Sequence, residues 1–203
     1  MRKSLISTED VDTFQKDGVV LIKGLFTDYV KIIRDGIEKN LANPGPSKPT
    51  PWHQDSPYYF VEETLNISFW SPMGQVKNAS LRCVAGSHKW AKAVLPQKWL
   101  NEENFFKNKQ NFMEVLDPDS DKNMQIKEFP MDPGNSVAFN FRILHGARGN
   151  KSNLQRRAFS LRLVGDDARF VERGERTSPP FPNHGMDSGQ TLREDWFQIT
   201  YSN

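Results

Sequence analysis

The feature that most constrains the fold is a run of short strand-like segments in the second half of the chain, separated by turn residues and not by helices. These segments are residues 64–72, 80–90, 124–130, 131–146 and 156–170. In the first, Leu65, Ile67 and Phe69 occupy every second position, which is the period of a strand with one face against a core. Because parallel sheets need crossover helices between strands, the pattern predicts a mostly β domain, either a sandwich or a small barrel.

The main helices are expected to gather before this β region, at the N-terminus. Ser7 precedes Asp10 by three residues in a capping-box pattern, and Gly18 ends the helix that Ser7 begins. A β-branched strand at 19–26 and a second helix at 27–41 should follow. Residues 42–51 are rich in proline and glycine, which predicts a loop.

The whole chain is expected to form one domain, residues 1–203, with three regions. These are an N-terminal helical region at 1–47, a β core at 48–175 and an irregular tail at 176–203. Within the core, the polar stretch 97–123 predicts an excursion with some helix. An apolar fraction of 36%, including 14 Phe and 5 Trp, is sufficient for a packed core.

Composition excludes several classes of function. A net charge of +2 gives no reason to expect a nucleic acid or an anionic membrane as partner. The single cysteine, Cys83, excludes an internal disulfide and is typical of a reducing compartment. No apolar run approaches the ~20 residues of a membrane span, so we expect a cytoplasmic protein. The chain also lacks the glycine-rich fingerprints of the common nucleotide sites.

His53 and Asp55 stand two residues apart in the segment PWHQD, residues 51–55. If this segment is extended, the two side chains project from the same face. An imidazole and a carboxylate on one face are two of the three ligands of a 2-His-1-carboxylate iron site. The alternative interpretation is a pair of polar neighbours in a loop.

A second histidine stands at the end of the apolar segment 131–146. His145 is followed directly by Gly146 and a loop, so it is a candidate metal ligand. It could equally be a strand-end histidine that is hydrogen-bonded in the core. The other two histidines are less well placed, because His88 lies in a turn and His184 in the irregular tail.

Arg156 begins the segment that follows, eleven residues after His145. In an extended chain, one face of this segment carries Arg156, Ala158, Ser160 and Arg162. An inward-facing guanidinium needs an anion, and its fork matches a carboxylate. A dicarboxylate bound to a metal at one end would bring its other carboxylate to such an arginine. The alternatives are an ion pair with a buried acid, or a strand end in solvent.

Five segments, in this order, resemble the phytanoyl-CoA dioxygenase family. They are TPWHQDSPYYF, LNISFWSPM, RCVAGSHKW, VAFNFRILHGARGNKS and RRAFSLRLVGDDARF. The most specific parts are PWHQD and the pattern HGxxxNxS followed by RxAxS. The resemblance covers residues 48–175 well and residues 5–35 weakly.

The resemblance implies an iron(II)- and 2-oxoglutarate-dependent oxygenase on a double-stranded β-helix, the jelly roll related to the cupins. By motif, His53, Asp55 and His145 would bind iron, Arg156 would bind the distal carboxylate of 2-oxoglutarate, and Trp70 would contact this co-substrate. The enzyme would use oxygen to hydroxylate a small molecule and release succinate and carbon dioxide. Since halogenating relatives lack the carboxylate, Asp55 favours hydroxylation. We expect a monomer or a homodimer.

One departure from the family pattern concerns the approach to the PWHQD motif. A longer stretch, with at least one strand of the jelly roll, usually precedes it, but here only residues 42–51 intervene. Either the sequence omits a segment that belongs between about Ser47 and Lys48, or the chain lacks part of the fold. We favour the omission. An intact mass near 23.3 kDa would contradict it.

The substrate is the least constrained part of the prediction. Arg162 and Asn66, with Arg82 and Arg142, are candidates to bind a polar or anionic substrate, although ion pairs or strand-edge hydrogen bonds explain each of them equally well. Arg162 leads because it shares a strand face with Arg156. The aromatic run 58–60 could line a substrate cleft, but packing in the core is the favoured expectation.

Two alternative functions remain open. One is a non-catalytic cupin-like protein that binds a small molecule. The other is a metal-dependent cupin isomerase or a dioxygenase without a co-substrate, neither of which would need Arg156.

Overall fold

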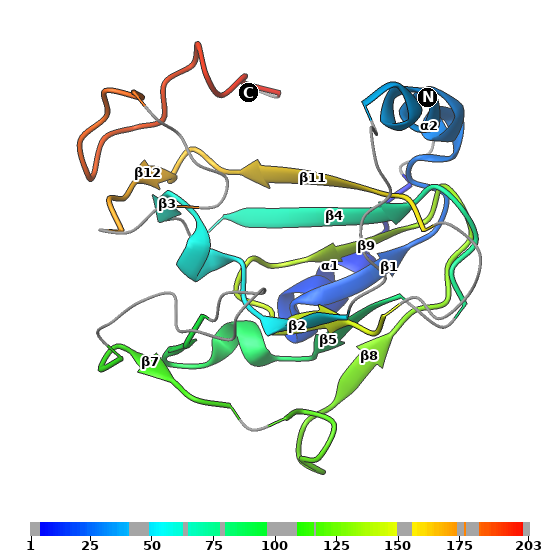
Figure 1. Cartoon of the computed structure of the whole chain (residues 1–203), viewed down its shortest axis with the longest axis horizontal. Coiled ribbons are helices and arrows are strands. Elements are labelled where there is room, and N and C mark those ends of the chain that lie inside the picture. Colours follow the sequence, from blue (N-terminus) through cyan, green and yellow to red (C-terminus); the bar gives the residue numbers. More distant parts are fainter. Residues whose placement is uncertain are drawn as a thin grey trace.

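Two four-stranded antiparallel sheets face each other in the computed structural model, which is drawn in Figure 1. The structure describes residues 5–40, 49–62, 65–77, 80–96, 109–115, 117–149, 156–173, 177 and 183–200. The first sheet has the order β1 (Val19–Ile22), β9 (Ser136–Phe139), β4 (Asn66–Pro72), β11 (Ala158–Val164). The second has the order β2 (Thr50–His53), β10 (His145–Ala147), β5 (Leu81–Val84), β8 (Ile126–Glu128).

The main core fills the space between the two sheets. Its fully buried residues come from both sheets, and include Val19, Val137 and Phe139 from the first and Leu81 and Cys83 from the second. The expectation of a mostly β jelly roll is therefore confirmed. Apart from β5 and β8, strands that follow each other along the chain alternate between the two sheets, so neither sheet is evident from the sequence order alone.

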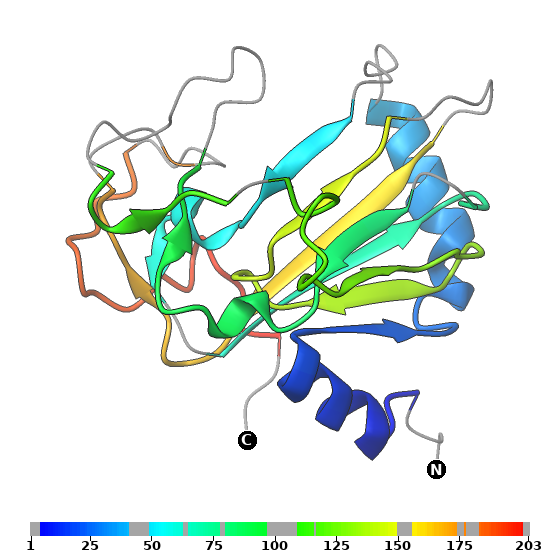
Figure 2. The same ribbon diagram turned by 90° about the horizontal axis from the view of Figure 1, so that it is seen from below.

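The first N-terminal helix forms as the capping signals predict, and it covers part of the outside of the first sheet. Ser7 caps α1 (Thr8–Asp17) with a complete capping box to Asp10, and Gly18 ends it in the left-handed conformation, φ 74°. Phe14 of α1 packs on the outward residues of β1, β4 and β9, and Figure 2 shows α1 in dark blue beside β1. The 3-10 helix η1 (Thr27–Tyr29) leads into α2 (Val30–Asn40).

The remaining elements are short. They are η2 (Ser56–Tyr58), β3 (Val61–Glu62), η3 (Ser87–Lys89), β6 (Ala93–Val94), β7 (Phe112–Met113) and β12 (Arg169–Phe170). β12 pairs with β3, and β6 pairs with β7. In the excursion 97–123, the described residues contain β7 and turns but no helix, and residues 97–108 lie outside the described part. The described tail, 183–200, has no helix or longer strand, in keeping with its irregular composition.

The sequence predicts that the segment 131–146 is a turn that leads into one long strand, and the turn is present but the long strand is not. β9 ends at Phe139 and β10 begins at His145, so the intervening residues turn the chain from the first sheet into the second. Asn140 makes this turn, because its side chain accepts from the N–H of Arg142 and its carbonyl accepts from Ile143. Phe141, Ile143 and Leu144 in this turn are each buried in a different cluster. The turn is therefore apolar, and its sequence resembles that of a strand.

β11 forms one edge of the first sheet, and no strand among the residues described here pairs with its outer side. Its residues are half-buried or exposed, in contrast to the buried strand β9. The segment predicted between Ser47 and Lys48 falls in residues 41–48, outside the described part, and stays a prediction. The loop predicted over 42–51 ends early, since Thr50 and Pro51 belong to β2.

Candidate metal centre

His53 and His145 meet because they are directly opposite each other in the second sheet. β2 and β10 run antiparallel with His145 and His53 as register partners. Directly opposed residues have Cβ atoms about 4.5–5.5 Å apart, and the two imidazole rings lie 4.2 Å apart between centroids. His145 therefore begins a strand, whereas the sequence placed it at a strand end.

Asp55 reaches the two histidines from a turn and not from an extended segment. β2 ends at His53, and Asp55 has the helical backbone angles φ −74° and ψ −39° at the start of η2. The N–H groups of Asp55 and Ser56 both donate to the carbonyl of Phe141, at 2.9 and 3.1 Å. The assumption that places His53 and Asp55 on one strand face is wrong, although the two side chains do converge.

The three side chains form a compact group of possible ligand atoms. Oδ1 of Asp55 lies 3.6 Å from Nε2 of His53 and 3.7 Å from Nε2 of His145. All three ligand atoms lie within 4.8 Å of one another, and each residue is buried. Two atoms bound at ~2.1 Å to one ion are at most ~4.2 Å apart, so the two distances to Oδ1 suit a shared metal.

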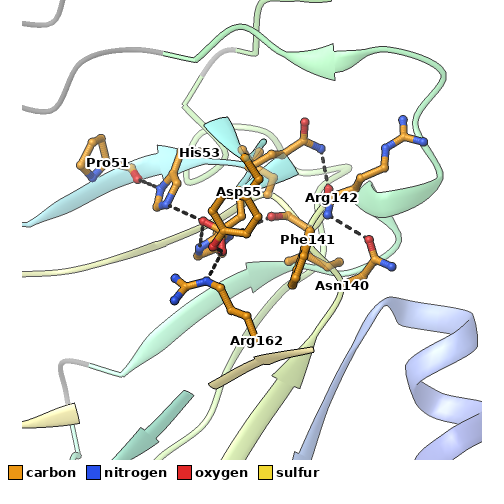
Figure 3. Close-up of polar contacts among 12 residues, drawn as sticks. Pro51, His53, Asp55, Asn140, Phe141, Arg142 and Arg162 are labelled. Atoms are coloured by element: carbon orange, nitrogen blue, oxygen red, sulfur yellow. Dashed lines mark hydrogen bonds and ion pairs between the residues drawn. The ribbon is translucent and has the colours of Figure 1, made fainter. Parts of the chain in front are cut away.

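The backbone fixes both imidazoles in the form that binds metal. Nδ1 of His53 donates to the carbonyl of Pro51 at 2.8 Å, and Nδ1 of His145 donates to the carbonyl of Ile143 at 2.9 Å. Each Nδ1 therefore carries a proton, which leaves Nε2 as the ring atom that could bind a metal. Figure 3 shows the His53 bond and the contact to Asp55. Two neutral imidazoles and one carboxylate fit a divalent metal.

Charge and burial keep the ligands in the protonation states that a metal requires. Burial, reinforced by His53, lowers the pKa of His145 to about 4, so this imidazole is neutral at physiological pH. Burial alone would raise the pKa of Asp55, but His145, His53 and Arg162 lower it below its usual range. Asp55 is therefore a carboxylate although it is 6% exposed.

The second oxygen of Asp55 has its own partners. The hydroxyl of Tyr59 donates to Oδ2 at 2.7 Å, and Nε of Arg162 lies 3.6 Å from it. Figure 3 shows Arg162 reaching Asp55 from below. Burial and the charge of Asp55 raise the pKa of Tyr59, so its hydroxyl remains a hydrogen-bond donor.

The middle residue of the His-x-Asp motif is also built into the site. Gln54 is 1% exposed. Its side-chain amide donates to the carbonyl of Arg142 and its oxygen accepts from the N–H of Val94 at 2.7 Å. It thus ties the motif to the turn before β10 and to β6.

Gly146 is needed because β2 passes directly over it. A Cβ at this position would lie 2.9 Å from the carbonyl oxygen of Thr50 and 3.2 Å from that of Pro51. The Pro51 carbonyl is the group that holds Nδ1 of His53. The glycine after His145 therefore preserves the hydrogen bond that orients the opposite histidine.

Replacing Gly146 with alanine should both destabilise the fold and weaken metal binding. We expect a loss of about 1–3 kcal/mol in the free energy of unfolding, as for other overpacked sites, together with lower metal affinity as Pro51 is displaced. Urea unfolding and metal titration measure the two effects. Gly36→Ala is the control, since nothing lies within 4 Å of its added Cβ and alanine favours a helix. Wild-type values for Gly146→Ala would contradict the role given to this glycine.

Arg156 and Trp70 both belong to the region of the paired strands β4 and β11. Arg156 is half-buried two residues before β11, and burial lowers the pKa of its guanidinium. Trp70 packs against the main core from β4, where its register partner on β11 is Ser160. Arg162, two residues along, reaches Asp55, so this face of β11 is turned toward the metal centre.

The other substrate candidates have structural partners. Oδ1 of Asn66 accepts from the N–H of Phe141 at 2.7 Å, which ties β4 to the turn before β10. Arg82 pairs with Asp119 and Glu128. Nη2 of Arg142 donates to the carbonyl of Trp90. The aromatic run 58–60 is buried, as expected, in a cluster with Phe141 and Phe170.

Sequence reasoning missed Tyr59 and Gln54 as parts of the site. The signal for Tyr59 was its position four residues after Asp55, across a Ser-Pro pair that starts a turn. The signal for Gln54 was weaker, because nothing in the sequence shows that the middle residue of His-x-Asp is buried.

A jelly roll with a buried 2-His-1-carboxylate group defines the class of non-haem iron oxygenases. The sequence profile of the phytanoyl-CoA dioxygenase (PhyH) family matches residues 39–158, and the chain belongs to this family. The matched range includes the three candidate ligands and Arg156. No curated protein sequence matched the chain.

Solved structures share the fold at low sequence identity. The 2-oxoglutarate-dependent epimerase SnoN from nogalamycin biosynthesis has a TM-score of 0.68 and 15% identity, over 92% of this chain and 95% of SnoN. The carbocyclase SnoK from the same pathway has a TM-score of 0.66 and 17% identity, over 93% of this chain and 94% of SnoK. EctD from S. alaskensis, solved with 2-oxoglutarate and 5-hydroxyectoine, has a TM-score of 0.64 and 15% identity, over 95% of this chain and 89% of EctD.

The part of the chain that the structure describes contains no helix with the length and apolar character needed to cross a bilayer.

Proposed function

We propose that this protein is an iron(II)- and 2-oxoglutarate-dependent dioxygenase that hydroxylates a small-molecule substrate. The observation that carries the proposal is the convergence of two Nε2 atoms and one carboxylate oxygen, with both Nδ1 atoms bound to backbone carbonyls. Membership of the phytanoyl-CoA dioxygenase family supports the choice of metal and co-substrate. SnoN and EctD have been crystallised with 2-oxoglutarate.

In this proposal His53, Asp55 and His145 would hold iron(II). The three protein ligands leave the opposite positions for the co-substrate and oxygen. When bound, iron and 2-oxoglutarate supply the oxidising chemistry, with succinate and carbon dioxide as by-products. The protein itself fixes the ligand geometry through the carbonyls of Pro51 and Ile143.

Arg156 is proposed to bind the distal carboxylate of 2-oxoglutarate, and Trp70 to contact the same co-substrate. The half-buried guanidinium of Arg156 lies in the sequence position that the family uses for this purpose, and burial strengthens its attraction for an anion. Trp70 is on the inward side of β4, against the core between the sheets.

Arg162 is the residue proposed to meet a polar or anionic group of the substrate. Its side chain is 44% exposed and its guanidinium lies beside Asp55 and over the ring of Tyr59, 5.4 Å from the ring centre. A substrate group bound there would be close to the metal. Asn66, the weaker candidate, already uses Oδ1 to accept from Phe141.

A screen of small metabolites for stimulated 2-oxoglutarate turnover tests this function. The protein is incubated with iron(II), ascorbate, oxygen and 2-oxoglutarate, and succinate and the mass of each product are measured. We expect one metabolite to stimulate succinate formation and to gain one oxygen atom. An unchanged product mass would indicate epimerisation, and a loss of hydrogen would indicate ring closure. No turnover, with no iron-dependent binding of 2-oxoglutarate, would favour the non-catalytic binding protein.

A further inference from the structure

The two oxygens of Asp55 face different surroundings, and this difference suggests a role for Tyr59. Oδ1 lies toward the two histidines, at 3.6 and 3.7 Å from their Nε2 atoms. Oδ2 accepts a 2.7 Å hydrogen bond from the hydroxyl of Tyr59. Rotation of the carboxylate to offer both oxygens to a metal would break this bond.

Tyr59 is itself held firmly, so its hydroxyl has little freedom to follow Asp55. Its ring is 7% exposed and packs edge-on against Phe141, with centroids 5.0 Å apart. Nε of Arg173 donates to the carbonyl of Tyr59 at 3.0 Å, and Nη2 donates to that of Val61 at 3.1 Å. The same Phe141 accepts the backbone N–H of Asp55 through its carbonyl. Phe141 thus contacts both Tyr59, the hydrogen-bond donor, and Asp55, its acceptor.

We propose that Tyr59 is a positioning residue, whose hydroxyl holds Oδ2 of Asp55 so that the carboxylate presents Oδ1 alone to the metal. Arg162 is a second, longer contact to the same oxygen. A one-oxygen ligand occupies one coordination position and leaves three for a chelating co-substrate and oxygen, whereas a two-oxygen ligand would leave only two. This inference rests on the proposed metal site.

The test compares metal binding by the wild type and Tyr59→Phe, which keeps the ring and its packing. Anaerobic titration with Mn(II), a redox-stable substitute, should show about 10–100-fold weaker binding for Tyr59→Phe, as when other outer partners of metal ligands are removed. Tyr29→Phe is the matched control, because Tyr29 is 55% exposed in η1, and it should bind like the wild type. Circular dichroism confirms that each variant is folded.

The outcomes separate this inference from the proposed function. If the wild type binds Mn(II) and Tyr59→Phe binds as tightly or more tightly, only the positioning role is wrong. If the wild type does not bind Mn(II), the metal site and the positioning role both fail. A crystal structure of the wild type with Mn(II) provides a test that needs no variant. It should show one Asp55 oxygen on the metal and the other on Tyr59, and a two-oxygen Asp55 would overturn the proposal.

Discussion

His145→Ala is expected to lose metal binding and turnover together. In the proposed site His145 offers one of three possible ligand atoms, and its Nδ1 is held by the carbonyl of Ile143. Removing an outer hydrogen-bond partner of a ligand costs about 10–100-fold in metal affinity, so removing the ligand itself should cost more than that. Anaerobic titration with iron(II) or Mn(II) measures the change, and succinate formation measures turnover.

The fold should survive this substitution, which makes the result interpretable. His145 begins a strand that pairs on both sides through backbone hydrogen bonds, and these do not depend on the side chain. His184→Ala is the control, because His184 lies in the tail against Phe170, with its Nδ1 bound to the N–H of Met186. A His145→Ala protein with wild-type metal affinity would contradict the assignment of this ligand.

Arg156→Ala is expected to weaken 2-oxoglutarate binding more than any other change outside the metal ligands. Truncating one partner of a buried charge pair costs about 2–5 kcal/mol, which is roughly 30- to 5,000-fold in affinity. The loss should be seen as a higher KM for 2-oxoglutarate, with metal affinity unchanged. Arg156→Lys keeps the positive charge but loses the forked guanidinium. Its KM for 2-oxoglutarate should therefore lie between those of the wild type and Arg156→Ala.

Arg148→Ala is the matched control for Arg156, because Arg148 is half-exposed and pairs with Glu128. It should leave the KM for 2-oxoglutarate unchanged. A metal-dependent isomerase, or a dioxygenase without a co-substrate, would keep its activity when Arg156 is replaced by alanine. Full activity in Arg156→Ala would therefore favour one of these alternatives.

Local signals in the sequence predict the elements better than their arrangement. The capping box at Ser7 and the end of α1 at Gly18 are confirmed because both depend only on nearby residues. The turn at 140–144 was missed because Phe141, Ile143 and Leu144 are apolar for three different clusters, and this apolar run resembles a continuing strand. Which cluster each residue enters is decided by residues far away in the chain.

At the candidate metal centre, too, the sequence predicts the residues better than their arrangement in space. The ligand types at His53, Asp55 and His145 could be predicted from motif and resemblance, but the reason they meet is the register of β2 with β10, for which the sequence carries no local signal. The positions of Tyr59 and Gln54 depend on the turn after β2 and on Phe141, Arg142 and Val94, which lie 40 to 88 residues from the side chains they contact. Side chains that support the ligands are therefore visible only in the structure.

Anaerobic binding of 2-oxoglutarate to the wild-type protein, with and without iron(II), tests the central claim most directly. If His53, Asp55 and His145 hold an iron ion that 2-oxoglutarate chelates, calorimetry should show one 2-oxoglutarate bound per chain in the presence of iron(II). Without the metal, affinity should be much weaker. Equal binding with and without iron(II), or no binding in either condition, would contradict the account.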